Sequence, residues 1–217
     1  MVGGVLSQDE DQYPQGVHKM IGWPMKRLSK PKNRMDRIAF AGPMCVGKTT
    51  LADGIAGLYE GYTKLAFADT LKGLAYSLYG VQGKDNESRK LLQELADDLK
   101  KWDHAVFIKS LLAKAELLIK DGHEKLVVDD VRFREEAEAL QRNGFMLFKV
   151  TCEENMRRNR IKTLYPDMDL SRMNHPSEHG WKRMKFDYSI DSTYEIAHFD
   201  LDGLILNGNT NRIYRKS

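Results

Sequence analysis

One stretch of the sequence, from Arg37 to Leu51, constrains the fold more than any other. It begins with a short apolar run over residues 38–41, and two glycines then bracket four residues, with Lys48 and Thr49 directly after the second glycine. This G-x-x-x-x-G-K-T pattern is typical of a phosphate-binding loop between a strand and a helix. The apolar residues before and after the loop supply both elements. The sequence therefore predicts a site for nucleotide phosphates, a P-loop, at this point.

Each residue type in this loop has a physical role. Glycines allow backbone N–H groups to approach phosphate oxygens, and the start of the following helix favours an anion. Lys48 is expected at the β- and γ-phosphates of ATP, and the Thr49 hydroxyl at Mg²⁺. The predicted ATP-binding residues are Gly42, Pro43, Met44, Cys45, Val46, Gly47, Lys48, Thr49 and Thr50.

Length and composition narrow the class of protein. The chain has 217 residues, of which 41% are hydrophobic, enough for one domain with a substantial core. Its apolar runs are far shorter than the roughly 20 residues of a membrane helix, and the N-terminus does not look like a secretory signal. Two cysteines cannot form a disulfide framework. We therefore expect a cytoplasmic protein with no membrane partner.

The first 35 residues differ from the rest of the chain. They show neither helical nor alternating periodicity, so we predict an irregular or disordered arm over residues 1–35 and a single domain over residues 36–217. The arm is basic, and two interpretations are open: a solvated tail, which we favour, or a contact with nucleic acid. The basic residues are Lys26, Arg27, Lys30, Lys32 and Arg34.

The order of predicted elements indicates the fold class. Strands are predicted over residues 37–41, 63–68, 125–129 and 145–151, with further candidates at 188–190 and 199–206. Amphipathic helices separate the first four, and residues 84–88 are predicted to be a loop. This alternation predicts an α/β fold, a parallel sheet of about five strands with helices on both faces. Because ligands of such sheets bind beyond the carboxyl ends of the strands, we expect Gly42, Asp69, Asp130 and Thr151 to lie near one another.

Several charged residues suit phosphoryl transfer. Asp130, or its neighbour Asp129, is expected to bind Mg²⁺ from the end of a strand; the alternative is a helix cap. Arg132 would grip an acceptor phosphate bidentately. Arg157 and Arg160 are three residues apart on one predicted helix, so both are expected over the transferring phosphate when a lid closes. Arg89, predicted in a loop, is either a phosphate ligand or a solvated residue.

These motifs, in this order, carry a resemblance. Residues 42–49, Phe67-Ala-Asp-Thr-Leu-Lys72, Arg89-Lys-Leu-Leu-Gln93, Val128-Asp-Asp-Val-Arg-Phe133 and His175-Pro-Ser-Glu178 together resemble the phage-type deoxynucleoside monophosphate kinases. The resemblance implies an acceptor-binding segment at about 69–101 and a lid at about 153–185. Its implied acceptor site consists of Asp69, Lys72, Arg89, Arg132, Glu136 and Glu178, and its implied catalytic residues are Lys48, Arg132, Arg157 and Arg160.

The same resemblance implies the reaction. ATP, with Mg²⁺, would phosphorylate a deoxynucleoside monophosphate, in a monomer or homodimer located in the host cytoplasm if a phage encodes it. The sequence departs from the family pattern at Arg134 and Glu135, where relatives carry Pro-Asn, and the resemblance ends near Asp191. Two alternatives stay open: a P-loop kinase of another small metabolite, and a P-loop ATPase or nucleic-acid-associated protein. The base preference cannot be read from the sequence.

Overall fold

The structure is a computed structural model that describes residues 27–82, 85–166 and 179–193. Its elements follow the chain in the order β1 (Arg37–Ala41), α2 (Lys48–Leu58), β2 (Tyr62–Leu65), α3 (Ala68–Tyr79), α4 (Asn86–Trp102), α5 (Val106–Lys120), β3 (Lys125–Val131), α6 (Arg134–Arg142), β4 (Met146–Thr151), α7 (Glu154–Leu164), the short 3-10 helix η3 (Gly180–Arg183) and β5 (Tyr188–Asp191). No helix within these residues is long and apolar enough to cross a bilayer.

The five strands form one sheet in the order β2-β3-β1-β4-β5, and every neighbouring pair is parallel. The P-loop strand β1 lies in the middle, and all five of its residues are buried. A strand covered on both faces needs apolar side chains on both, which explains the continuous apolar runs in the sequence. The predicted parallel α/β sheet is confirmed.

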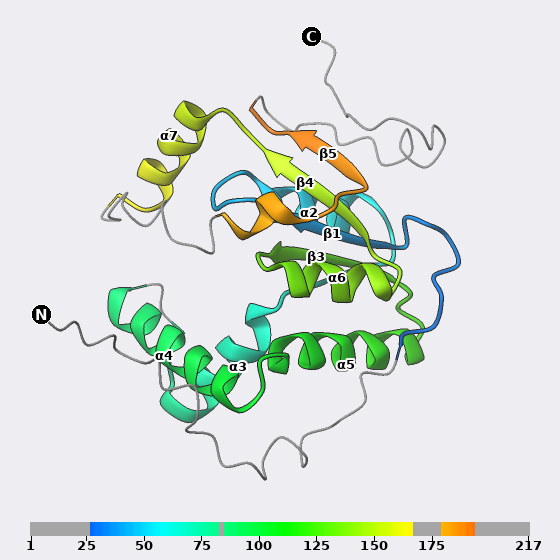
Figure 1. Ribbon diagram of the computed structural model, residues 1–217, viewed down its shortest axis with the longest axis horizontal. Helices are drawn as coiled ribbons and strands as arrows, with labels where there is room; N and C mark the ends of the chain where they lie inside the picture. The colour runs from blue at the N-terminus through cyan, green and yellow to red at the C-terminus, as the bar shows by residue number, and fades with distance from the viewer. Residues whose placement is uncertain (1–26, 83–84, 167–178, 194–217) are drawn as a thin grey trace, which may run out of the picture.

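Two hydrophobic clusters, one on each face, hold the sheet in place. Leu126 and Val128 of β3 belong to the cluster that includes α5 and α6, whereas Val127 faces the cluster that includes α2. Figure 1 shows this layering, with α5 and α6 on one side of the sheet and α2 on the other. Each large side chain buried in this way contributes about 1.5–3 kcal/mol. The layers fix the position of the P-loop at the carboxyl end of β1.

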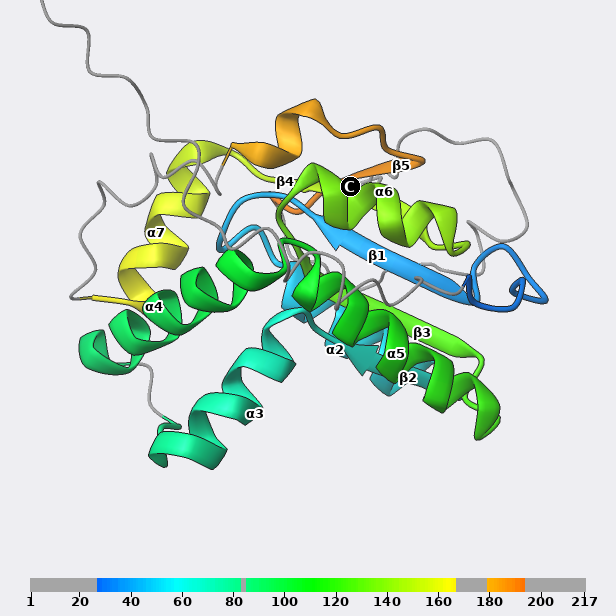
Figure 2. The ribbon, with the colours of Figure 1, turned by 60° about the horizontal axis from the view of Figure 1, so that its bottom comes forward.

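Helices α3 and α4 pack against α5 and the core through Leu71, Ala96 and Leu99. They are here called the acceptor lobe, because they coincide with most of the predicted acceptor-binding segment. They contact each other, but in α3 the single buried side chain is that of Ala75. Figures 1 and 2 show this lobe beside the sheet at the end where the strands finish, with α7 across from it.

Several element boundaries differ from the sequence prediction. Strand β2 ends at Leu65 rather than continuing to residue 68, and Phe67 already has a helical backbone. The loop predicted over residues 84–88 is wrong at its C-terminal end, since α4 begins at Asn86 and includes Arg89. The signal was present, because the Asp85 carboxylate caps the helix by accepting bonds from the N–H (2.8 Å) and hydroxyl (2.6 Å) of Ser88.

Residues 27–36, at the end of the predicted arm, contain no helix or strand and lie against the domain. The N–H of Leu28 donates to Asn143 Oδ1 at 2.9 Å, and Met35 is buried. Gly144, with a φ of 82°, is needed there, because a Cβ at this position would lie 2.8 Å from Pro31 Cδ. The rest of the predicted arm and the candidate strand at 199–206 lie outside the described residues.

Candidate functional site

The P-loop, residues 42–49, has a backbone that its sequence explains. Gly42 and Gly47 have φ values of 150° and 90°, and Cys45 lies in the left-handed region with a φ of 59°. A Cβ on Gly42 would lie 2.3 Å from the carbonyl oxygen of Val150 in β4. Glycine at position 42 therefore serves two needs, the φ value and the close approach of the loop to the sheet.

Carbonyl oxygens of the loop are bound by side chains on two sides. Lys48 Nζ donates to the carbonyls of Gly42 (2.8 Å) and Pro43 (2.7 Å). From other parts of the chain, Arg157 Nε donates to Met44 O at 3.0 Å, and Ser192 Oγ donates to Val46 O at 2.6 Å.

These contacts bear on the loop amides. Because the C=O and N–H of a trans peptide point in opposite directions, the N–H groups after Met44 and Val46 point away from the side chains that bind these two carbonyls. Together with the amides in the first turn of α2, they offer N–H groups suited to an anion.

Helix α7 carries the two predicted lid arginines on one face, as their spacing implies. Arg157 is buried, contacts the P-loop and forms an ion pair with Glu154 at 3.3 Å. Arg160 donates to the carbonyl of Ser192 (2.6 Å) and to its hydroxyl (3.3 Å), and this hydroxyl in turn binds the P-loop. Both guanidinium groups thus lie at the P-loop, where they support its outer side. Their contact with a transferring phosphate stays a prediction.

The two carboxylates at the end of β3 point to different places. Asp130 accepts hydrogen bonds from the N–H groups of Phe67 (2.8 Å) and Ala68 (2.9 Å), so it caps the start of α3. Burial raises the pKa of Asp130, against the opposing effect of these amide bonds. The cap, which was the alternative for Asp130, is therefore the role that its contacts display.

Asp129 lies on the same face of the sheet as the P-loop helix. It is buried and pairs with Lys64 at 3.0 Å, and Lys64 also pairs with Asp53 of α2 at 2.8 Å. Of the two carboxylates, Asp129 is thus the one on the side of α2, the helix that begins with Lys48 and Thr49.

Arg132 and Glu136 meet at the turn between β3 and α6. One carboxylate oxygen of Glu136 accepts from the N–H groups of Arg132 (2.8 Å) and Phe133 (3.0 Å). Burial raises the pKa of Glu136 to about 7, and these amide bonds and the charge of Lys100 oppose the rise. Glu136 therefore shapes the turn, and the exposed side chain of Arg132 extends from it at the carboxyl end of the sheet.

The short helix η3 packs closely on the same turn. A Cβ on Gly180 would lie 2.7 Å from the carbonyl oxygen of Arg132. The chain after the predicted lid helix therefore returns to the site and touches the residue that was predicted to hold the acceptor phosphate. The sequence reasoning did not single out Gly180, because its role depends on a contact between distant segments.

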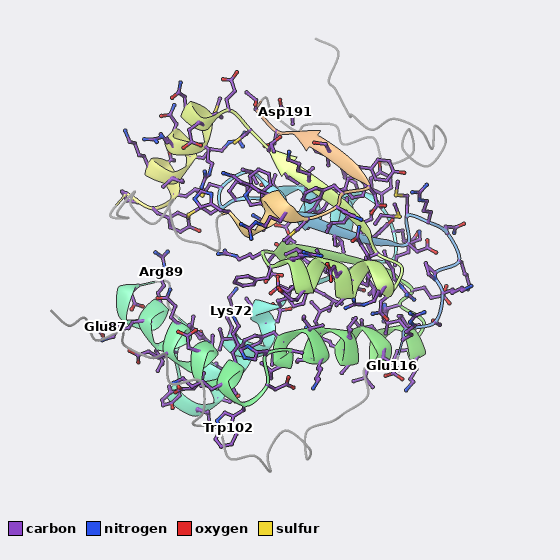
Figure 3. All side chains as sticks on the ribbon, in the orientation of Figure 1. Lys72, Glu87, Arg89, Trp102, Glu116 and Asp191 are labelled. Carbon is purple, nitrogen blue, oxygen red and sulfur yellow. The ribbon has the colours of Figure 1, made fainter. Side chains whose placement is uncertain are left out.

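The acceptor lobe brings the remaining predicted residues to the same side. Asp69 accepts from the N–H of Ala66 (3.2 Å) and pairs with Lys114 (3.3 Å), so its present contacts are structural. Lys72 is exposed, and Figure 3 shows Lys72 and Arg89 on the side of the lobe that faces the sheet. Arg89 lies over the ring of Tyr165, with its Cζ 5.0 Å from the ring centroid. The sixth residue of this set, Glu178, lies outside the described residues.

Lys100 of α4 is a further cation at this side that sequence reasoning missed. Its Nζ lies 4.8 Å from the ring centroid of Phe133 and 5.9 Å from that of Phe107. In the sequence it resembles the other lysines of a solvated helix face, so only the fold reveals that it reaches the turn after β3.

A hollow of about 250 Å³ lies at the opposite, N-terminal ends of the strands, near the starts of β2 and β3. Its lysines are already engaged, Lys32 with Glu124 at 2.9 Å and Lys125 with the carbonyl of Glu60 at 3.1 Å. The P-loop and the basic side chains lie at the carboxyl ends of the strands, which is where ligands of parallel sheets bind, so this end is the better candidate for the functional site.

The residues at this edge suit Mg²⁺ that arrives with a nucleotide. Among the described residues, no group of three or more histidine, cysteine or acidic side chains could hold a metal ion. The hydroxyl of Thr49 and the carboxylates at the end of β3 are oxygen ligands of the kind that Mg²⁺ takes when phosphates and water supply the rest.

The comparisons with known proteins agree with this geometry. The AAA domain family matches residues 38–180, so the chain belongs to this family. The sheet, the P-loop and this family together define a P-loop nucleotide-binding domain.

A solved structure and the curated proteins were compared with the chain as well. A "putative kinase" from Chloroflexus aurantiacus j-10-fl, solved as a crystal structure, has 15% sequence identity and a TM-score of 0.49, and the match covers 82% of this chain and 95% of that one. Such a distant likeness carries no information about the reaction. A search of curated proteins gave no match.

Proposed function

We propose that the protein transfers the γ-phosphoryl group of ATP to a deoxynucleoside monophosphate, giving ADP and a deoxynucleoside diphosphate. The observation that carries this proposal is that basic side chains from three separate parts of the chain lie along the side of the domain that holds the P-loop. Arg132 comes from the turn after β3, Arg89 and Lys100 from α4, and Arg157 from α7. A site for a single nucleotide does not need so many cations beyond its own loop.

In the proposed reaction, a phosphate oxygen of the acceptor forms a bond to the γ-phosphorus as the bond from this phosphorus to the β,γ-bridging oxygen breaks. The electron pair of the broken bond remains with ADP. Loop amides and Lys48 would hold the ATP phosphates, so Lys48 would exchange its present bonds to Gly42 O and Pro43 O for phosphate oxygens. Positioning and charge stabilisation supply most of the catalysis in reactions of this class.

Thr49 and a carboxylate at the end of β3 are the proposed residues that hold Mg²⁺. Bound there, Mg²⁺ would neutralise charge that develops on the phosphate oxygens. The sequence assigned the carboxylate to Asp130, with Asp129 as the alternative, and the position of Asp129 on the α2 face makes it the better candidate.

Arg132 is proposed to bind the acceptor phosphate, because it extends from a turn that Glu136 and Gly180 hold in place. A guanidinium group presents paired N–H donors that match two phosphate oxygens. Asp69 and Glu136 have structural contacts, so their proposed part in acceptor binding is to position the helices that border it.

The proposal is tested by a coupled assay of ADP release with ATP, Mg²⁺ and each deoxy- and ribonucleoside monophosphate in turn. Acceleration by at least one deoxynucleoside monophosphate over ATP alone is expected. If no monophosphate accelerates ADP release, the proposal is wrong. A panel of other phosphorylated metabolites in the same assay separates the alternative of a metabolite kinase, and added DNA separates that of a nucleic-acid-associated ATPase.

A further inference from the structure

Helix α4 and the C-terminal end of α7 are in contact through Arg89 of α4 and Tyr165, the residue that follows α7. The Arg89 guanidinium carbon lies 5.0 Å from the centroid of the tyrosine ring. A cation over an aromatic face is attracted by the ring quadrupole. These two residues are 76 positions apart (165 − 89), so the contact is a product of the fold.

The position of Arg89 is poor for the stability of its own helix. It lies in the first turns of α4, near the positive end of the helix dipole, where a second positive charge is unfavourable. Among the described residues, no carboxylate forms an ion pair with Arg89, whereas its neighbour Lys90 approaches Glu94 at 3.9 Å. Asp85 and Glu87 offset the positive end of the helix, but neither forms an ion pair with the Arg89 guanidinium, which therefore keeps its charge for an anionic ligand.

Tyr165 holds the arginine in relation to the P-loop. It caps the C-terminus of α7, and its N–H donates to Ile161 O at 2.8 Å, which ties the backbone of Tyr165 to the last turn of the helix. At the other end of α7, Arg157 binds the carbonyl of Met44 in the P-loop. One rigid helix therefore relates the ring over which Arg89 lies to the loop that binds ATP phosphates.

The contact with a ring also leaves the arginine available for a ligand. A carboxylate partner would occupy its N–H donors, but an aromatic face attracts the charge without accepting conventional hydrogen bonds from the whole guanidinium edge. Bidentate binding of a phosphate remains open to a guanidinium group held in this way.

We infer that Tyr165 is a positioning residue, which holds Arg89 so that its donors face the phosphate of the acceptor. The inference rests on the proposed function and adds to it a residue that neither the P-loop nor the sequence motifs identify. It also implies that α7 contributes to acceptor binding through its C-terminal end. This helix of 11 residues spans the distance between the P-loop and α4.

The experiment compares Tyr165→Phe, Tyr165→Leu, Arg89→Ala and the double variant Tyr165→Leu/Arg89→Ala by steady-state kinetics, with KM measured separately for ATP and for the monophosphate. Tyr165→Leu should raise KM for the monophosphate about fivefold, the size expected for the loss of an exposed cation–π contact, and leave KM for ATP unchanged. Tyr165→Phe keeps the ring and should behave like the wild type. In the double variant, KM should be no higher than in Arg89→Ala alone.

A matched control uses another contact of the same kind on α4. Phe133→Leu removes the nearer of the two rings that Lys100 contacts and leaves Tyr165 in place. If Tyr165 only helps α4 to pack, then Arg89→Ala and Tyr165→Leu will act additively, as Arg89→Ala and Phe133→Leu should. Equal KM values for Tyr165→Leu and wild type, equal effects of the Leu and Phe variants, or additivity would each overturn the inference.

The wild-type protein separates this failure from that of the proposed function. If the wild type phosphorylates a monophosphate and the Tyr165 variants match it, the kinase proposal stands and the role of Tyr165 is wrong. If the wild type phosphorylates none, both are wrong.

Discussion

The P-loop and the acceptor lobe face each other, but they are held in place by different kinds of interaction. Around the P-loop, Lys48, Arg157 and Ser192 are buried, and each donates a hydrogen bond to a loop carbonyl. In the acceptor lobe, α3 buries Ala75, and rings contact the Arg89 and Lys100 side chains of α4.

This difference implies that the two regions differ in local stability. Buried hydrogen-bonded groups open only at a large free-energy cost, whereas helices with few buried apolar contacts belong to the low-stability part of a fold. Under the proposed function, the P-loop is therefore preformed for ATP, and the acceptor lobe is the part that adjusts when the monophosphate binds. Amide hydrogen exchange should be slower in β1 than in α3.

The largest expected effect is on turnover, from a substitution in the P-loop. Lys48→Ala removes the cation at the ATP phosphates, and we expect turnover to fall at least about a thousandfold, the scale of losing a preorganised charge in phosphoryl transfer. The measurement is kcat in the ADP-release assay. Lys90→Ala is the control, because Lys90 is an exposed lysine of α4 with a weak ion pair to Glu94. Wild-type turnover in Lys48→Ala would mean that the P-loop is not the ATP site.

A pair of glycine substitutions compares the packing of the two regions directly. In Gly42→Ala, the new Cβ would lie 2.3 Å from Val150 O at a φ of 150°, so the loop or β4 must shift. We expect a loss of about 2–4 kcal/mol in the free energy of unfolding, together with weaker ATP binding. Gly73→Ala in α3 meets nothing within 4 Å and should stabilise the protein by about 0.5–1 kcal/mol.

Denaturant unfolding of both glycine variants provides the measurement. Equal effects of the two substitutions would contradict the contrast between a tightly packed P-loop and an open acceptor lobe. A destabilising Gly73→Ala would show that α3 is covered on the side that the structure leaves exposed.

The next effect is expected at the boundary between the two regions. Arg132→Ala should raise KM for the monophosphate about 10- to 100-fold and leave KM for ATP nearly unchanged, since a charged, bidentate phosphate contact is lost. Arg134→Ala is a matched control two residues away, because Arg134 is exposed and pairs with Glu138 at 2.6 Å within α6. Equal weakening of ATP and acceptor by Arg132→Ala would contradict its placement.

The fold could be predicted from the sequence to a large extent, because its signals are local. The glycine spacing from 42 to 47, the buried run of β3 and the helical periods each depend on neighbouring residues, and together they determine a parallel sheet with the P-loop at its carboxyl edge. The predicted boundaries of β2 and α4 were wrong because helix caps determine them. Asp85 caps α4, and Asp130 of β3 caps α3, the helix that follows β2.

For the candidate site, the sequence suggested which residues would lie near the P-loop, but it could not give their contacts, and their roles stay predictions. Sequence position brought Arg132, Arg157 and Arg160 to one edge, yet it could not show that Arg157 binds a loop carbonyl or that Lys100 reaches Phe133. Nor could it separate Asp129 from Asp130, because adjacent residues in a strand face opposite sides, and the face of α2 becomes known only when the layers are placed.

The smallest expected effect concerns pH and the turn that carries Arg132. The folded protein raises the pKa of Glu136 from 4.5 to about 7, chiefly by burial. Because the folded pKa is the higher one, the contribution of this group to stability is fully present below about pH 4.5 and is lost as the pH rises through about 7. Glu136→Gln keeps an oxygen that can accept from Arg132 N–H and Phe133 N–H but does not titrate between these values.

The measurement is the free energy of unfolding from pH 5 to pH 8, which should fall more steeply in the wild type than in Glu136→Gln. If the turn positions Arg132, KM for the monophosphate should show the same difference between the two proteins. Parallel pH profiles of the two proteins would mean that Glu136 is solvated and ionised throughout, and that the turn after β3 belongs with the adjustable acceptor lobe rather than with the preformed P-loop.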